Sequence, residues 1–397
     1  MTPDRDGETG ESRLRGASAS LVAGAVRDRD PLPGTRGFAG LLASPPASED
    51  DADDPVLVRD VLGRQPLFVE ADATDPTDPD AWSFDRGCLR DPDPVPAGSV
   101  VSATETGRRW SLPTFPASDP EPARAAVDDA IETALSDLAV EDAATSSGRL
   151  AVAFSGGVDS ALIASAVPDV PCYVAGFEGC HDVAAAREAA AAMDRDLRTV
   201  ELTHDDLRRA IPEIAAATGR RNPMDLNIAV PLYLTAEAAA ADGIERLTVG
   251  QGADELFGGY SKVVDPANDH RVEADTVRGA RDETVRTLPR QLERDVLTLR
   301  AAGVEPVAPL LDDRVVDAAL RLPGDLLATA DERKVALRRA ATGRVPESVR
   351  TADKKAVQYG TYVSREIDRL ARQNGFKRRM DDHVGQYVDA LLEGHAV

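Results

Sequence analysis

The 397-residue sequence is poor in cysteine, histidine and aromatic residues, and it contains no long apolar run. Its three cysteines, Cys88, Cys172 and Cys180, are an odd number without the spacing of a metal site, which fits a reducing compartment. The five scattered histidines argue against a zinc cluster. No apolar run reaches membrane-spanning length, and the first thirty residues lack the apolar core of a signal peptide. We therefore expect a soluble, cytoplasmic protein that does not bind membranes.

Lysine is scarce as well. Acidic residues outnumber basic residues by 69 to 46, which gives a net charge of −23, and only five of the 46 basic residues are lysines. The acids are spread along the whole chain rather than confined to a tail. Two interpretations stay open: a surface adapted to very high salt, where screening reduces self-repulsion, or a surface for a basic partner. We favour the first, and so broad an acidic surface also argues against nucleic-acid binding.

Composition divides the chain into three parts. Residues 1–34 are acidic and rich in small polar residues, so we expect a mobile segment. Residues 35–113 contain short strand-like runs separated by Pro and Asp residues, which is typical of a small β unit. Residues 114–397 form the largest part and begin with a helical pattern of apolar residues.

Strand-like and helix-like runs alternate through the first half of this largest part. The strand-like runs are 149–154, 172–177, 197–202 and 246–251, and the helix-like runs are 161–167, 183–193, 205–217 and 228–241. Such alternation predicts an α/β fold with a doubly wound parallel sheet, which binds ligands at the carboxyl ends of its strands. Beyond residue 270 the pattern is mostly helical.

The first strand-like run ends in a polar, glycine-rich turn. A strand that passes through this turn into a helix directs several backbone N–H groups toward one point, and the helix dipole adds positive potential there. We expect the turn to hold phosphate without the lysine of a Walker motif, which is absent. The turn residues are Ser155, Gly156, Gly157, Val158, Asp159 and Ser160. Asp159 would repel phosphate unless Mg²⁺ lay between them; the alternative is a plain turn in which Asp159 only caps the helix.

A second acidic, glycine-rich turn, "GQGADELFGGY" at 250–260, follows another strand-like run of the same sheet. Gly250 and Gly252 would permit close approach to the backbone, and Asp254 and Glu255 offer carboxylates. Two strand ends of one sheet can meet at its switch point. We therefore expect Asp159 and Asp254 to share a magnesium ion.

The two turns resemble the signatures of a known family. "FSGGVDS" is similar to the first signature of the PP-loop ATP pyrophosphatases, and "GQGADELFGGY" is similar to the second signature of asparagine synthetases and their β-lactam synthetase relatives. NAD synthetases, GMP synthetases and tRNA-thiolating enzymes share the first signature but lack the second. The segments at 173–190, 231–243 and 307–323 also resemble blocks of the asparagine synthetase family, in the same order.

The resemblance implies a reaction and a set of binding residues. Family members activate a carboxylate with ATP and Mg²⁺, release pyrophosphate, and let ammonia displace AMP. The turn 155–160 would then bind pyrophosphate, with Asp159 and Asp254 holding the magnesium ion. The backbone at Ala175 and Gly176 would bind the adenine, and Gly250 would line the AMP site.

The family also places a lysine near its C-terminus to stabilise the negative charge that develops during activation. "ADKKAVQYGT" at 352–361 resembles that block, and its spacing to Gly360 favours Lys354 over Lys355. The alternative is a pair of solvated surface lysines. Lys334 matches another family lysine, although a structural role on a helix surface is an equal alternative.

Two positions depart from the family pattern. Gln251 stands where the family has glutamate, and a neutral amide cannot act as a general base. Arg36 stands where the family's glutaminase domain has its cysteine nucleophile. Segments at 56–68, 95–101 and 108–113 resemble strands of that domain, so we interpret residues 35–113 as a truncated structural remnant that does not hydrolyse glutamine.

Three functional hypotheses follow. The first is an ATP-dependent amidoligase that uses aspartate, with ammonia taken free or from a partner glutaminase; an oligomer is compatible with it. The second is a related ligase that acts on another carboxylate. The third is a nucleotide-binding relative without catalytic activity, which the retained turns and lysines argue against.

Overall fold

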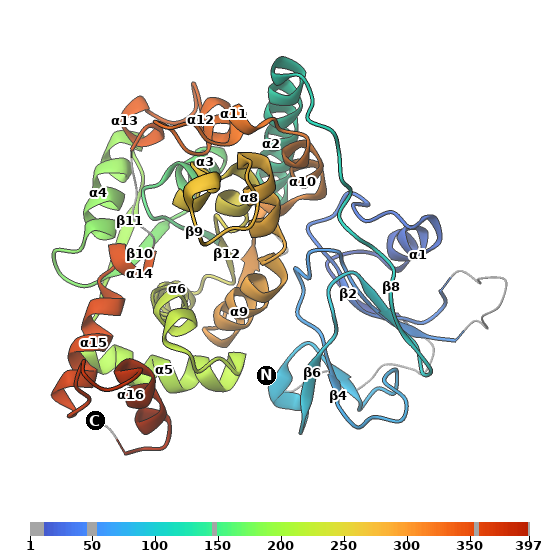
Figure 1. The fold of residues 1–397 in the computed structure, drawn as a ribbon, viewed down its shortest axis with the longest axis horizontal. Helices are drawn as coiled ribbons and strands as arrows, with labels where there is room; N and C mark the ends of the chain where they lie inside the picture. The colour runs from blue at the N-terminus through green and yellow to red at the C-terminus, as the bar shows by residue number, and fades with distance from the viewer. Residues whose placement is uncertain (1–11, 46–53, 145–148, 353–356, 396–397) are drawn as a thin grey trace.

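The computed structural model describes residues 12–45, 54–144, 149–352 and 357–395. Figure 1 shows two parts: a small N-terminal part of β-structure, and a larger part in which helices surround a sheet. The long helix α2 (Pro120–Ala143) begins the larger part and packs against α10 (Asp313–Leu320).

The N-terminal part contains two small sheets. One has the strand order β1-β2-β3-β7-β8, with every pair of neighbours antiparallel, and the other has the order β5-β4-β6. The strands are β1 (Arg13–Arg15), β2 (Ala39–Leu42), β3 (Val56–Arg59), β4 (Phe68–Glu70), β5 (Trp82–Ser83), β6 (Pro92–Pro94), β7 (Ser99–Val101) and β8 (Thr106–Arg108). This arrangement agrees with the small β unit that the sequence predicts.

The expectation that residues 1–34 are mobile is wrong for the part that the structure describes. β1 pairs with β2, and α1 (Ala19–Asp28) packs onto the β-structure with Val22, Ala25 and Val26 buried. The side chain of Ser18 accepts a hydrogen bond from the backbone N–H of Leu21 and caps the helix. The composition concealed this helix because its apolar face consists largely of alanine and valine among serines and glycines.

The larger part is a doubly wound α/β domain, as the sequence predicts. Its five strands have the order β11-β10-β9-β12-β13, and all neighbours are parallel. The strands are β9 (Leu150–Ala153), β10 (Cys172–Gly176), β11 (Leu197–Glu201), β12 (Arg246–Thr248) and β13 (Glu305–Val307). From β9 the chain adds β10 and then β11 on one side of the sheet. It then adds β12 and β13 on the other side of β9, so the switch point lies between β9 and β12.

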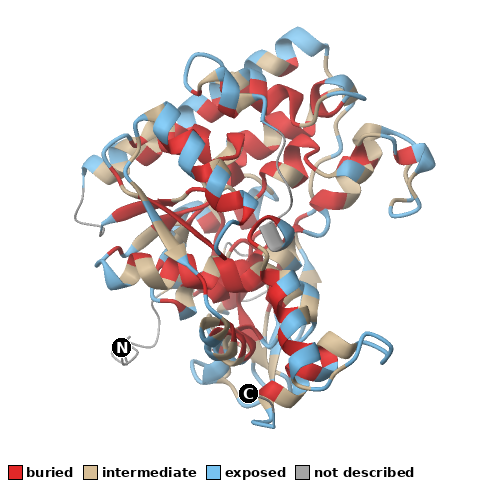
Figure 2. Cartoon of the chain, turned by 90° about the vertical axis from the view of Figure 1, so that its left-hand side faces the viewer, coloured by how far each residue is buried: buried red, intermediate tan, exposed pale blue. Residues whose placement is uncertain are grey.

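Alternate residues of the central strands face two different apolar layers. Val152 and Val174 belong to the layer that contains α2 and α3, whereas Ala151 and Tyr173 belong to the layer that contains α5 and α6. Helices therefore cover both faces of the sheet, and its strands are buried on both sides (Figure 2). The helices up to β13 are α3 (Val158–Ala166), α4 (His181–Met193), α5 (His204–Thr218), α6 (Pro223–Ala241), α7 (Ala253–Phe257), α8 (Val277–Val285) and α9 (Leu288–Ala301).

The region after β13 is helical, in agreement with the sequence pattern. Its remaining helices are α11 (Gly324–Leu327), α12 (Val335–Ala340), α13 (Glu347–Arg350), α14 (Val357–Gly360), α15 (Val363–Gln373) and α16 (His383–Leu392). Among the described residues, no helix is both long and apolar enough to cross a membrane. The cysteines are unpaired, and burial raises the pKa of the Cys172 thiol to about 12.

Candidate functional site

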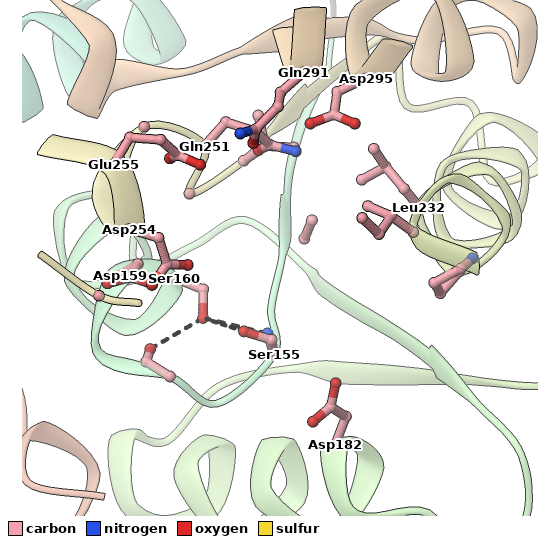
Figure 3. A pocket seen from close by; sticks show the side chains of 18 of the residues that line it. Ser155, Asp159, Ser160, Asp182, Leu232, Gln251, Asp254, Glu255, Gln291 and Asp295 are labelled. Atoms are coloured by element: carbon pink, nitrogen blue, oxygen red, sulfur yellow. Dashed lines mark hydrogen bonds between the residues drawn. The ribbon is translucent and has the colours of Figure 1, made fainter. Parts of the chain in front are cut away.

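The two glycine-rich turns meet at the switch point of the sheet. A Cβ atom placed on Gly250 would lie 3.1 Å from Cβ of Asp159, so the turns after β9 and β12 touch. Their side chains line a cavity of about 950 Å³ at the carboxyl ends of the strands (Figure 3). Helices α6 and α9 contribute the opposite wall, for example with Leu232 and Asp295. A cavity of this size can hold a nucleotide together with a small acid.

The first turn is held together by its own hydrogen bonds at the start of α3. The Ser160 hydroxyl accepts a hydrogen bond from the backbone N–H of Ser155 at 3.2 Å and donates one to the carbonyl of Gly157 at 3.1 Å. Gly156 has φ +73°, and a Cβ there would lie 2.6 Å from the carbonyl oxygen of Ala185 in α4, so only glycine fits. Helix α3 begins directly after Gly157, and its positive end therefore faces the cavity.

Lys334 connects the two turns. Its Nζ lies 2.6 Å from Oδ2 of Asp159 and 2.9 Å from Oδ1 of Asp254. The side chain is only 11% exposed, so the alternative of a helix-surface role is wrong. Burial alone would lower the pKa of the ammonium group, but attraction to Asp159 and Asp254 outweighs burial and raises the pKa above its ordinary value. Lys334 is therefore charged and held at the centre of the site.

The carboxylates around Lys334 also suit a magnesium ion. Oδ1 of Asp159 is buried and accepts no hydrogen bond from a described residue, so it can bind a further cation. No group of three or more His, Cys, Asp or Glu side chains with metal-binding geometry occurs in the described part of the chain. Mg²⁺ commonly uses one or two carboxylates and completes its ligand shell with water and substrate phosphates. Asp159 and Asp254 fit that requirement.

The buried Glu255 and the half-buried Tyr260 form a pair beside these carboxylates. The Tyr260 hydroxyl donates a hydrogen bond of 2.5 Å to Oε1 of Glu255. Burial, and then the neighbouring charge of Asp254, raise the pKa of Glu255 to about 7. Burial also raises the pKa of Tyr260, and the charges of Glu255, Asp254 and Asp295 raise it further. The Glu255 carboxyl is therefore only partly ionised near neutral pH.

Gln251 lies where the large cavity meets a second cavity. The second cavity has a volume of about 470 Å³ and runs between the N-terminal part and the α/β domain. Four residues line both cavities: Val249, Gln251, Leu292 and Asp295. Figure 3 shows Gln251, Gln291 and Asp295 together on the side of the cavity away from Ser155. This end of the large cavity is therefore distinct from the end formed by the turn at 155–160.

The residues expected around the adenine are only partly in the cavity wall. Ala175 lines the cavity, whereas Gly176 packs against Cys180, whose Sγ would lie 2.4 Å from a Cβ on Gly176. Gly156 likewise packs against α4 instead of lining the cavity. The other predicted turn residues within the described chain all line it: Ser155, Gly157, Val158, Asp159, Ser160, Gly250, Gln251, Gly252, Asp254 and Glu255.

Lys354 and Lys355 lie outside the described residues. The chain on either side of them reaches the cavity, because Ala352, Tyr359 and Thr361 line it. Gly360 lies against Asp182 of α4, and a Cβ on Gly360 would be 2.0 Å from Oδ1 of Asp182. The described residues that flank the two lysines therefore lie at the cavity, next to the end of β10.

The sequence did not point to several other polar residues of the cavity. Described residues of this kind are Asp182, Arg271, Gln291, Asp295, Arg333 and Arg338. Arg333 donates to the carbonyl of Gly259 at 2.9 Å, which holds it beside the second turn. Apart from Asp182, which lies in the segment 173–190, these residues lie on helices or loops without a local motif, so only the fold reveals that they converge.

The N-terminal part packs on α9 and α2 through arginines. Arg36 contacts Glu141 of α2, which also accepts from Arg246 at 3.1 Å. Arg59 of β3 lies 3.4 Å from Glu293 of α9, and both side chains are nearly buried. The position that the resemblance assigns to a nucleophile is therefore occupied by a guanidinium group in an ion pair.

The parallel sheet, the glycine-rich turn at 155–160 without a Walker lysine, and the carboxylates of Asp159 and Asp254 at the switch point are the features of a PP-loop α/β domain. The family model described as "Asparagine synthase" matches residues 130–296 and 278–396. The chain belongs to the asparagine synthase family.

Relatives with assigned names agree with this membership. The chain is 27% identical over 278 residues to the "Putative asparagine synthetase 1", described as glutamine-hydrolyzing, of Methanocaldococcus jannaschii, covering 61% of this chain and 51% of that protein. It is 25% identical over 233 residues to the glutamine-hydrolyzing asparagine synthetase B of Escherichia coli, covering 54% and 41% of the two chains. The chain thus spans about half the length of the curated relatives it matches.

The NAD⁺ synthetase from Burkholderia pseudomallei is a solved structure that aligns with part of this chain. It shares 15% identity with this chain at a TM-score of 0.24, and the alignment covers 64% of this chain and 98% of that one.

Proposed function

We propose that this protein is an ATP-dependent carbon–nitrogen ligase that adenylates a carboxylate and transfers ammonia to it, with aspartate as the favoured substrate. One observation carries the proposal: Lys334, Asp159 and Asp254 converge where the phosphate turn meets the second glycine-rich turn. A charged amine between two carboxylates, at the positive end of a helix, suits the triphosphate of ATP.

In this proposal, different described residues have different roles in the reaction. The turn 155–160 binds the β- and γ-phosphates through backbone N–H groups and hydroxyls. Lys334 places positive charge beside the departing pyrophosphate. Asp159 and Asp254 would hold Mg²⁺, which supplies Lewis-acid stabilisation of phosphate charge when bound. The carboxylate substrate attacks the α-phosphorus, forming an acyl-adenylate and releasing pyrophosphate; ammonia then displaces AMP.

Lys354 is our candidate for a second cationic group in the activation step. It rests on the resemblance of its block to the family pattern and on the position of its neighbours Ala352 and Tyr359 in the cavity wall. Lys355 is its closest competitor.

We propose that free ammonia, or ammonia from a partner, is the nitrogen source. Arg36 has no nucleophilic atom, and its pairing with Glu141 supports a structural role for the N-terminal part. Purified protein should therefore form no amide from glutamine and release no glutamate, and glutamine-dependent product at the ammonium-dependent rate would overturn this point.

Carboxylate-dependent exchange between ATP and pyrophosphate tests the activity. Aspartate, glutamate and a panel of other amino acids are supplied with ATP and Mg²⁺, and products formed with ammonium are identified by mass spectrometry. Exchange with aspartate and formation of asparagine are the expected results. Exchange with a different acid would favour the related ligase, a hypothesis that Gln251 supports as a departure from the family pattern. Nucleotide binding without exchange would leave only a non-catalytic role.

A further inference from the structure

Five acidic side chains line the large cavity within the described chain: Asp159, Asp182, Asp254, Glu255 and Asp295. Their surroundings differ. Asp159 and Asp254 contact Lys334, and Glu255 accepts the Tyr260 hydroxyl. Asp182 lies at the other end, near the close of β10. Of these five, Asp295 alone also lines the second cavity.

Asp295 is held in one orientation by its neighbour. Nε of Arg294 donates a 2.8 Å hydrogen bond to Oδ1 of Asp295, and another nitrogen of Arg294 binds Asp225 at 2.8 Å. The Asp295 side chain is only 8% exposed. No described residue donates a hydrogen bond to Oδ2 of Asp295. The arginine therefore fixes the orientation of the Asp295 carboxylate through Oδ1 and leaves Oδ2 for a ligand.

The transfer of nitrogen requires a group that can accept a proton, such as a carboxylate. At neutral pH ammonia is present mainly as ammonium, which has no lone pair and cannot attack a carbonyl carbon. Gln251 and Gln291, which lie on the same side of the cavity (Figure 3), can hydrogen-bond to ammonium but cannot take its proton. A carboxylate can attract the cation and accept the proton.

On the basis of the proposed function, we propose that Asp295 binds the ammonium ion where the two cavities meet and accepts one of its protons as nitrogen attacks the acyl-adenylate. The broken N–H bond leaves its electron pair on nitrogen, and the proton passes to Oδ2 of Asp295. The nitrogen lone pair forms the C–N bond, and the C–O bond to the adenylate phosphate breaks, so that AMP leaves with that electron pair. Nitrogen loses a second proton to water as the amide forms.

Three assays on Asp295→Asn test the assignment. Carboxylate-dependent ATP–pyrophosphate exchange needs no nitrogen and should stay within about twofold of wild type. Amide formation from ammonium should fall by about 10²-fold or more, the usual contribution of a general base. Hydroxamate formation from hydroxylamine, which is neutral at pH 7 and already has a lone pair, should be largely retained.

Asp225→Asn is the matched control, because it removes the other carboxylate from Arg294 without altering a residue of either cavity wall. All three of its rates should match wild type. Asp295→Glu keeps a carboxylate and should keep the ammonium reaction within about tenfold, which gives a second readout if Asp295→Asn folds poorly.

Wild-type amide formation by Asp295→Asn would overturn the assignment. The assignment would also be overturned if Asp295→Asn lost amide and hydroxamate formation equally. It would be overturned as well if the Asn and Glu variants had the same ratio of amide to hydroxamate. Either result would mean that Asp295 has a structural role. Absence of exchange in the wild-type protein is a separate outcome: it refutes the proposed function, and the assignment of Asp295 falls with it.

Discussion

Nζ of Lys334 lies 2.6 Å from the carboxylate of Asp159, although the two residues are 175 positions apart in the sequence. Lys334 adopts a left-handed backbone conformation, φ 57°, at the start of α12, and this directs its side chain inward between the two turns. With Asp254 it forms a charge cluster that joins the turn after β9, the turn after β12 and the helical C-terminal region.

Replacing Lys334 with methionine should weaken both the fold and the reaction. Asp159 and Asp254 would lose their shared counter-ion, so the melting temperature should fall by a few degrees without divalent cations. Added Mg²⁺ should raise the melting temperature of Lys334→Met more than that of wild type, because the ion would replace the missing positive charge. ATP–pyrophosphate exchange should fall by about 10²-fold. Lys377→Met, outside the cavity wall, is the control; equal effects of the two variants would contradict the role of Lys334.

Glu255 predicts a specific dependence of stability on pH. Its pKa of about 7 in the folded protein exceeds the ordinary 4.5, so between these values the folded state binds the proton more tightly and stability falls as the pH rises. Glu255→Gln is neutral at every pH and can still accept from Tyr260. Without divalent cations, the variant should exceed wild type by about 3 kcal/mol in free energy of unfolding at pH 8, and by less than about 1 kcal/mol at pH 5.

Urea unfolding of both proteins at the two pH values measures this difference. A stabilisation of the same size at pH 5 and pH 8 would mean that the effect does not come from ionisation of Glu255.

Sequence patterns predicted those parts of the site that depend on local spacing. The turn at 155–160 and "GQGADELFGGY", which both line the cavity, could be singled out because glycines and acids at fixed positions directly after a strand are typical of ligand-binding turns. The alternating runs predicted the parallel sheet because their periodicity is also local. Asp295 could not be identified in this way, because it lies in an amphipathic helix where an acid normally faces solvent. Its place at the junction of two cavities depends on how α9 packs between the N-terminal part and α6.

The buried ion pair between the N-terminal part and α9 predicts a large effect on stability. In Glu293→Gln the guanidinium of Arg59, with only 3% of its side chain exposed, would lose its charged partner. Removing one member of a buried pair costs about 3 kcal/mol. Glu305→Gln, which weakens the more exposed pair with Arg300 of the same helix, should cost less than about 1 kcal/mol. Urea unfolding compares the two variants, and similar losses would contradict the importance of the buried pair.

The acidic surface predicts that salt stabilises the fold. A net charge of −23 produces self-repulsion, which salt screens over shorter distances as its concentration rises. We expect the melting temperature to increase between about 0.1 M and about 2 M KCl, where the screening length falls well below 10 Å. A flat or falling melting temperature would favour the other interpretation, in which the acids serve a basic partner.

Lys354 is predicted to stabilise negative charge that develops only as the carboxylate attacks ATP. A group of this kind affects the transition state more than the ground state, so its removal should lower kcat and leave the KM for ATP almost unchanged. Lys354→Ala should reduce kcat by about 10²–10³-fold, as the loss of other preorganised charge-stabilising groups does. Lys354→Arg should restore little of the lost kcat, because the planar guanidinium is larger and places its charge elsewhere.

Lys355→Ala is the adjacent control and should lower kcat only slightly. ATP–pyrophosphate exchange measures all three variants: a severe loss in Lys355→Ala with normal exchange in Lys354→Ala would shift the assignment by one residue, and normal exchange in both would refute a catalytic role for this block.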